Sequence, residues 1–141
     1  MDAISYEYVP NQMSNLPKRF KIWSEKVGNV QADVSSENPK TAELVLNALP
    51  INARANRWGE EIYFSTPVNA NEENGRIEVE VGSVAYWPPG KAVCIFFGRT
   101  PVSMGSAPRA ASAVNVFAKI VGDSVVFKKV RDGDEIKLES A

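Results

Sequence analysis

Aromatic, arginine and hydroxyl side chains gather in the second half of the chain, around predicted strands. Such side chains can bind a ligand without covalent chemistry. Aromatic walls and a methionine would hold an apolar or proline-containing segment, and an arginine would bind a carbonyl or carboxylate group. We expect these residues to border a cleft at the surface of the domain. The candidate ligand-binding residues are Tyr63, Tyr86, Trp87, Phe97, Arg99, Thr100, Ser103 and Met104.

Several of these candidates also have a purely structural interpretation. Tyr63, Tyr86 and Phe97 lie in predicted strands, where large rings commonly pack in the core. Arg99 follows the end of a strand and could instead form a solvated or structural ion pair. Trp58, in a polar Arg-Trp-Gly-Glu context, fits a core or a surface role equally well. The sequence leaves these alternatives open.

The residue types present exclude several kinds of catalysis. The chain has no histidine, which excludes serine–histidine and cysteine–histidine catalysis and histidine-ligated metal sites. Its single cysteine, Cys94, lies in the apolar run 92–97, so we expect a buried and inert thiol. The pairs Glu60-Glu61 and Glu72-Glu73 are adjacent, and neighbours in a strand point to opposite faces. We therefore predict no catalytic residue, no metal ion and no cofactor.

Length and charge indicate one ordinary globular domain. The chain has 141 residues, 16 lysines and arginines, and 17 aspartates and glutamates. Without a basic excess it does not suit nucleic-acid binding. No apolar run is long enough to span a membrane, and the N-terminal segment lacks the features of a signal peptide. We expect a cytoplasmic protein whose partner is a small molecule or peptide, with no nucleic acid and no membrane.

One helix and eight or nine short strands account for the chain from residue 18 onward. Asn38 is a suitable N-cap, Pro39 suits the first helical position, and Pro50 ends the helix, which predicts a helix over about 38–49. Short strands with turn signals about every ten residues indicate an antiparallel barrel or sandwich. Residues 1–17 form a polar extension, either a docked arm or a disordered tail. The predicted strands are 20–23, 27–34, 61–65, 76–81, 83–87, 91–97, 114–121, 125–130 and 135–139.

The segment 82–101 is the most informative about the fold. Pro88-Pro89-Gly90 must be a turn, since prolines lack the backbone donor that a central strand needs, and Gly90 could supply a positive φ. Residues 92–97 are apolar on both alternating faces. We therefore expect this strand to be covered on both sides, by the barrel interior on one and by the helix or a loop on the other.

A set of short motifs, taken in order, points to a known family. The motifs are Asn38-Pro39-Lys40-Thr41-Ala42, Leu49-Pro50, Trp58-Gly59-Glu60-Glu61-Ile62-Tyr63-Phe64, Val81-Gly82, Tyr86-Trp87-Pro88-Pro89-Gly90, Phe97-Gly98-Arg99-Thr100-Pro101 and Asn115-Val116. Over about residues 18–141 the chain resembles the cyclophilin-like family of small single-domain prokaryotic proteins with no firmly assigned function. The resemblance implies a mainly β fold, a closed or nearly closed eight-stranded antiparallel β-barrel with helical caps.

Three functions remain open from the sequence. The first is a binding module for a small molecule or peptide. The second is a prolyl isomerase, with Arg99 beside Phe97 and Met104 easing a rotation barrier of about 18–20 kcal/mol. Isomerase cyclophilins, however, carry a Phe-His-Arg strand and a Gln-Gly-Gly-Asp-like segment that this chain lacks, so no catalytic residue is transferred. The third is a structural protein that forms a homodimer through edge strands or the N-terminal arm.

Overall fold

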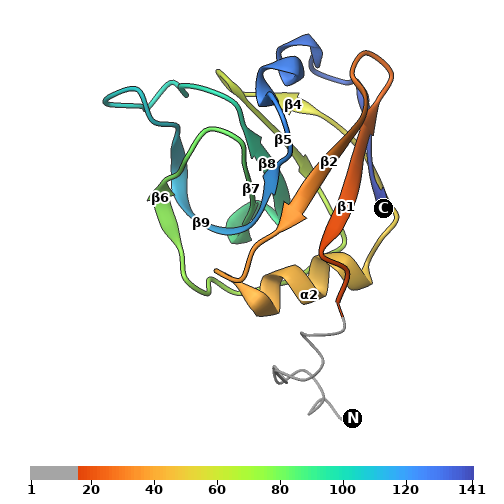
Figure 1. The fold of residues 1–141 in the computed structure, drawn as a ribbon. Helices are drawn as coiled ribbons and strands as arrows, with labels where there is room; N and C mark the ends of the chain where they lie inside the picture. Colours follow the sequence, from red (N-terminus) through yellow and green to blue (C-terminus); the bar gives the residue numbers. More distant parts are fainter. Residues whose placement is uncertain (1–15) are drawn as a thin grey trace.

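The computed structural model describes residues 16–141, and the expectations about an N-terminal arm or tail fall largely outside them. Within this range the chain forms one α-helix, two short 3-10 helices and ten strands (Figure 1). No helix among these residues is long and apolar enough to cross a membrane. The strands are β1 (Arg19–Ser24), β2 (Gly28–Val34), β3 (Ile51–Arg54), β4 (Asn56–Arg57), β5 (Glu61–Ser65), β6 (Arg76–Glu78), β7 (Ser83–Trp87), β8 (Ala92–Phe96), β9 (Arg109–Ile120) and β10 (Glu135–Ser140).

Nine of the strands form one continuous antiparallel sheet. Its order is β3-β10-β1-β2-β9-β7-β8-β5-β4, and β6 pairs separately with β9. The two outermost strands, β3 and β4, follow one another in the chain with only Ala55 between them. The sheet therefore curves round until its ends meet in the sequence, although no hydrogen-bonded ladder closes it. The predicted mainly β, cyclophilin-like architecture is confirmed.

The interior of the curved sheet holds the main hydrophobic core. The helix α2 (Pro39–Asn47) lies across one end, and the 3-10 helix Ser124–Lys129 lies at the other (Figure 1). Ala42, Val45 and Leu46 of α2 are buried in this core, at the spacing that predicted the helix. Phe127 of the 3-10 helix is fully buried at the opposite end.

Strand β8 is covered on both faces, as its sequence predicted. Val93 and Ile95 belong to the main core, whereas Cys94 and Phe96 belong to a second cluster on the outer face of the sheet. Neither α2 nor an irregular loop forms most of this outer cover. The first half of β9 folds over the sheet, pairing with β6 from residue 109 to 114, while its second half pairs with β2 and β7. The second cluster consists of Val79, Ala85, Cys94, Phe96, Ala110, Val114 and Val116.

Three predicted strands differ from the structure, and β3 and β4 were not predicted. β9 begins at Arg109, five residues before the predicted start at residue 114. Residues 125–130 were expected to form a strand but form most of a 3-10 helix, where the Asp123 side chain accepts a hydrogen bond from the Val125 N–H at 3.0 Å. The strand expected over 76–81 is limited to β6, and Ile77 and Val81 are exposed although Val79 is buried. The pairing of β6 with β9 has a register shift between Arg76 and Glu78, and β6 ends at Glu78, so Ile77, Val79 and Val81 do not share one strand face.

The Pro88-Pro89-Gly90 turn forms as predicted, but Gly90 has a different role from the one expected. The positive φ falls on Lys91, at 48°. Gly90 instead lies against the Trp87 indole, where an added Cβ would approach within 2.6 Å of the ring atom Cζ3. The glycine is needed because a large ring occupies the space that a side chain would take.

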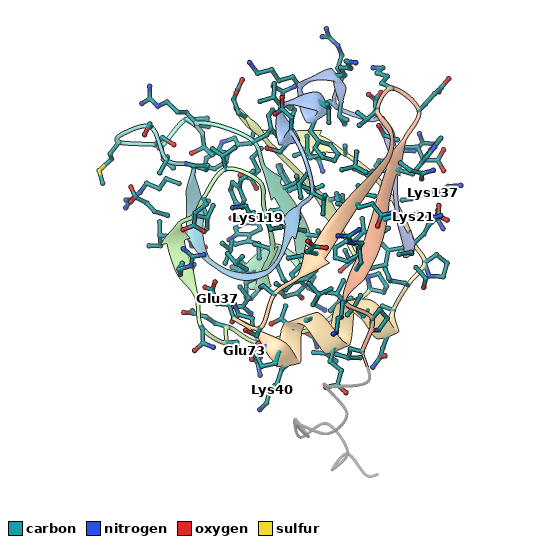
Figure 2. The ribbon with its side chains drawn as sticks, viewed as in Figure 1. Lys21, Glu37, Lys40, Glu73, Lys119 and Lys137 are labelled. Atoms are coloured by element: carbon teal, nitrogen blue, oxygen red, sulfur yellow. The ribbon has the colours of Figure 1, made fainter. Side chains whose placement is uncertain are left out.

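The N-terminus of α2 is also capped differently from the prediction. The Asn38 side chain does not cap the helix, and its Nδ2 donates to the Val116 carbonyl oxygen at 2.7 Å. Glu73, from the loop before β6, accepts hydrogen bonds from the backbone N–H groups of Lys40 at 3.2 Å and Thr41 at 3.1 Å. Figure 2 shows Glu73 and Lys40 together at this end of the helix. A distant carboxylate therefore satisfies these donors and favours the positive end of the helix dipole.

Candidate functional site

A pocket of about 250 Å³ opens on the outer face of the sheet, beside the first half of β9. Strands β5, β7 and β8 contribute one wall, β9 contributes the facing wall, and the turn between β4 and β5 contributes a tryptophan. The lining is mostly aromatic and aliphatic, with one carboxyl group. The residues that line it are Trp58, Glu61, Tyr63, Trp87, Cys94, Ala110, Ala111 and Val114.

The alternation of side chains along strands places these residues on one face. In β5, Ile62 and Phe64 enter the main core, so Glu61 and Tyr63 face outward. Tyr63 lies opposite Cys94 of β8 in the antiparallel register. The same two-residue period that builds the core therefore brings the pocket residues of neighbouring strands together.

Glu61 is the one acidic group of the pocket, and it is almost fully buried, with 5% of its surface exposed. Burial raises the pKa of its carboxyl to about 7, and a hydrogen bond with the Cys94 thiol offsets part of this rise. Among residues 16–141, no group donates a hydrogen bond to its Oε1 atom. A buried polar atom without a partner is unusual and calls for a specific explanation.

Cys94 lies beside this carboxyl and is buried, as the sequence predicted. Burial, and then the negative charge of Glu61, raise the pKa of the thiol well above its usual value. The thiolate is the reactive form of cysteine, so Cys94 is held in its unreactive, protonated state. It contributes an apolar surface to the floor of the pocket.

Two tryptophans are fixed at the edge of the pocket by their surroundings. The Trp87 Nε1 donates a hydrogen bond to Ser112 Oγ of β9 at 2.7 Å, which ties the two walls together. The backbone N–H of Trp58 donates to the Glu61 carbonyl oxygen at 2.9 Å, and the Glu61 N–H returns a bond to Trp58 at 3.2 Å. Both indoles are half-buried, so each has surface left for a ligand.

The tight turn that carries Trp58 depends on Gly59. This residue has a φ of +62°, a region that favours glycine, and an added Cβ would lie 2.8 Å from Pro101 Cδ. The Glu60 N–H also donates to the Arg99 carbonyl oxygen at 2.8 Å. Two of the sequence motifs thus pack directly against each other, and their contact positions Trp58 and Glu61.

Of the eight predicted ligand-binding residues, Tyr63 and Trp87 line the pocket. Tyr86 is fully buried on the other face of β7, where its hydroxyl donates to the Val68 carbonyl oxygen at 2.7 Å. Phe97 is 2% exposed, and the Arg57 guanidinium lies 5.0 Å from its ring centroid. Both rings are therefore core residues, which is the structural alternative that the sequence left open.

The other four candidates lie in the loop before β9, and three of them, Arg99, Thr100 and Ser103, form hydrogen bonds within it. Arg99 Nη2 donates to the Ser103 carbonyl oxygen at 3.2 Å, and Thr100 Oγ1 donates to the Arg109 carbonyl oxygen. The Ser103 hydroxyl accepts from the Thr100 N–H at 3.0 Å. Met104 is 75% exposed and does not line the pocket. Ligand binding by this loop stays a prediction.

Sequence reasoning did not select Glu61, Cys94 or the β9 wall, and it left Trp58 open between a core and a surface role. The available signal for Glu61 was an acidic residue at the start of an otherwise apolar strand, EIYFS. The β9 wall is made by small residues in the run RAASAV, which carries no chemical signal of its own. In residues 16–141, no group of three His, Cys, Asp or Glu side chains lies close enough to hold a metal ion.

The nearly closed antiparallel sheet, with α2 at one end and a 3-10 helix at the other, defines a cyclophilin-like domain. A family model described as Cyclophilin-like matches residues 18–139. The chain therefore belongs to the cyclophilin-like family, which has no assigned function.

Among solved structures, the chain is similar to the solution structure of the hypothetical protein AF2241 from Archaeoglobus fulgidus. The two share 44% sequence identity with a TM-score of 0.76, and the match covers 89% of this chain and 96% of that chain. A search of curated proteins found no match.

Proposed function

We propose that this domain binds a small organic molecule in the pocket beside β9. Ligand sites are typically concave and mostly apolar, with a few polar groups that fix the orientation of the ligand. The pocket has this character, since three aromatic side chains and three aliphatic ones surround one carboxyl group. Its volume of about 250 Å³ suits a compact ligand.

The unpartnered Oε1 atom of Glu61 is the observation that carries this proposal. Leaving a buried polar atom without a hydrogen bond costs about 1–3 kcal/mol. A ligand with a suitable donor or positive charge would remove this cost on binding. Three other buried side-chain atoms among residues 16–141 also lack a partner, namely Ser24 Oγ, Gln31 Oε1 and Ser35 Oγ, but of these four residues only Glu61 lines the pocket.

The alternatives from the sequence have less support. An isomerase site would need Arg99 beside an open apolar surface that includes Phe97, but Phe97 is buried and Arg99 bonds to its own loop. The homodimer through the N-terminal arm concerns mainly residues outside the described range. A cytoplasmic location stays a prediction.

Tryptophan fluorescence offers a direct test of binding. The chain has three tryptophans, and replacing Trp23 by phenylalanine leaves Trp58 and Trp87, which both line the pocket. We expect compact molecules such as choline or neohexyl alcohol to change the fluorescence of this variant in a saturable way. Ala111 is an exposed pocket-lining residue, so Ala111→Phe should fill the opening and weaken binding by about tenfold or more.

Met104→Phe is the matched control, because it adds the same ring to an exposed residue outside the pocket. It should leave the titration unchanged. The proposal would be contradicted if no compact neutral or charged molecule gave saturable binding. Equal affinities in the Ala111→Phe variant and its parent would also contradict it, whereas a loss in Met104→Phe alone would move the site to the loop.

A further inference from the structure

We infer that the ligand of this pocket is an organic cation, a methylated ammonium group held between the aromatic side chains and the Glu61 carboxylate. This inference rests on the proposed function and specifies its ligand. It follows from three features of the pocket: its aromatic rings, its unpartnered acidic oxygen and its aliphatic wall.

The rings supply the first argument. Trp58, Tyr63 and Trp87 come from three different segments, the β4–β5 turn, β5 and β7, and all three line the same pocket. Each is only half-buried. Aromatic faces attract cations, tryptophan most strongly, and several rings around one site are the usual means of binding quaternary ammonium groups.

The charge in the pocket supplies the second argument. Of the eight residues that line it in the described part of the chain, Glu61 is acidic and none is basic. Its Oε1 atom has no partner among residues 16–141. The positive charge of a cation would be attracted to this carboxylate without a hydrogen bond, whereas an anion would be repelled by both the carboxylate and the negative faces of the rings.

The opposite wall indicates which kind of cation fits. Ala110, Ala111 and Val114 present aliphatic surface to the pocket. A primary ammonium has three N–H donors, each of which needs an acceptor once it leaves water. A methylated ammonium instead presents methyl groups, which pack well against this wall. The pocket therefore favours a methylated ammonium over a primary one.

The protonation of Glu61 gives the inference a pH dependence. Burial raises the pKa of this carboxyl to about 7, and a bound cation favours its ionised form. The other titratable groups of the pocket are Cys94 on β8 and Tyr63 on β5, and the pocket-lining residues of β7 and β9 add none. Affinity for a cation should therefore rise between pH 5 and pH 8, with a proton released on binding.

Three molecules of nearly equal shape separate charge from size. Choline is cationic, neohexyl alcohol is its neutral carbon analogue, and tert-butylacetate is an anionic one. In the Trp23→Phe protein at pH 8, we expect choline to bind about tenfold more tightly than neohexyl alcohol. Binding of tert-butylacetate should be the weakest. Lowering the pH to 5 should weaken choline binding by up to about tenfold, toward the affinity of neohexyl alcohol, and leave neohexyl alcohol unchanged.

Two neighbouring glutamates provide a matched pair of variants. Glu61→Gln keeps the shape of the side chain and removes its charge, so choline should lose its preference over neohexyl alcohol. Glu60 faces away from the pocket, with its carboxylate 3.8 Å from Lys128 Nζ, and Glu60→Gln should change nothing. Because neohexyl alcohol still reports on the pocket, its unchanged binding would show that Glu61→Gln remains folded.

The outcomes distinguish this inference from the proposed function. If neohexyl alcohol binds as tightly as choline, or if Glu61→Gln keeps the choline preference, the cation inference is wrong and the pocket remains a binding site. If none of the three binds, the proposed function itself fails. A short peptide that contains trimethyl-lysine is the last ligand to test. If it binds more tightly than choline, the methylated ammonium belongs to a lysine side chain of a peptide, and the inference of a cationic ligand still holds.

Discussion

The two faces of the sheet formed by β5, β8 and β7 are built from the same strands, but they differ in how completely their side chains are packed. On the inner face, residues such as Phe64, Ile95 and Val84 are completely buried in the main core. On the outer face, Tyr63 and Trp87 remain half-buried around a pocket. One face is packed for stability, and the other retains space beside chemically distinctive groups.

Two buried polar side chains of these strands, Tyr86 and Glu61, also differ. Tyr86, on the inner face, donates to the Val68 carbonyl oxygen at 2.7 Å and accepts from the Ala70 N–H at 3.2 Å. Glu61, on the outer face, has a carboxyl oxygen with no partner among the described residues. The hydrogen bonds of the Tyr86 hydroxyl stabilise the fold. The unpartnered Glu61 oxygen lowers the folding stability, and a role in ligand binding would explain why it is present.

The largest difference in stability should appear between variants of two adjacent residues on β5, Phe64 and Tyr63, which face opposite sides of the sheet. Phe64→Ala removes a fully buried ring and should lower the free energy of unfolding by about 4 kcal/mol. Tyr63→Ala should lower it by only about 1 kcal/mol, because that ring is half-buried. Urea denaturation at pH 7 measures both. Equal losses would show that the outer face is packed as completely as the inner one.

The next effect concerns the buried carboxyl and should depend on pH. The folded-state pKa of Glu61, about 7, lies above the ordinary value of 4.5, so the folded protein holds the extra proton between these values. Stability is therefore fully present below about pH 4.5 and falls as the pH rises toward 7. Glu61→Gln should raise the free energy of unfolding by up to about 3 kcal/mol at pH 8 and change it little at pH 4.

Tyr86→Phe is the contrasting variant and should have a smaller effect than Phe64→Ala or Glu61→Gln. It leaves the Val68 carbonyl oxygen and the Ala70 N–H without this partner, so the free energy of unfolding should fall by about 1–2 kcal/mol. The loss should be the same at pH 4 and pH 8. A gain in stability from Tyr86→Phe, or a pH-independent gain from Glu61→Gln, would remove the distinction between the two faces.

Local sequence patterns were sufficient for much of the fold. The helix was predictable because Ala42, Val45 and Leu46 recur at helical spacing between Pro39 and Pro50. The 3-10 helix was not, since residues 125–130 are rich in β-branched and aromatic side chains that locally suit a strand. In the structure this segment buries Phe127 at one end of the sheet, and Asp123 caps the 3-10 helix.

Local sequence patterns predicted only part of the candidate site. Tyr63 and Trp87 could be selected because large rings on predicted strands either pack in the core or line a pocket. Glu61 could not, because its position beside Glu60 in the sequence does not show which of the two is buried, and its burial depends on the β9 wall about fifty residues away. Contacts of this range arise from the bend of β9 over the sheet, which no local pattern specifies.

The most direct measurement is an NMR titration of the Glu61 side-chain carboxyl carbon, with and without choline. We expect a pKa of about 7 in the free protein, set by burial, and a clearly lower pKa when saturating choline occupies the pocket. Neohexyl alcohol should not lower it. A pKa near 4.5 in the free protein, or one that choline leaves unchanged, would contradict a buried carboxylate that pairs with an organic cation.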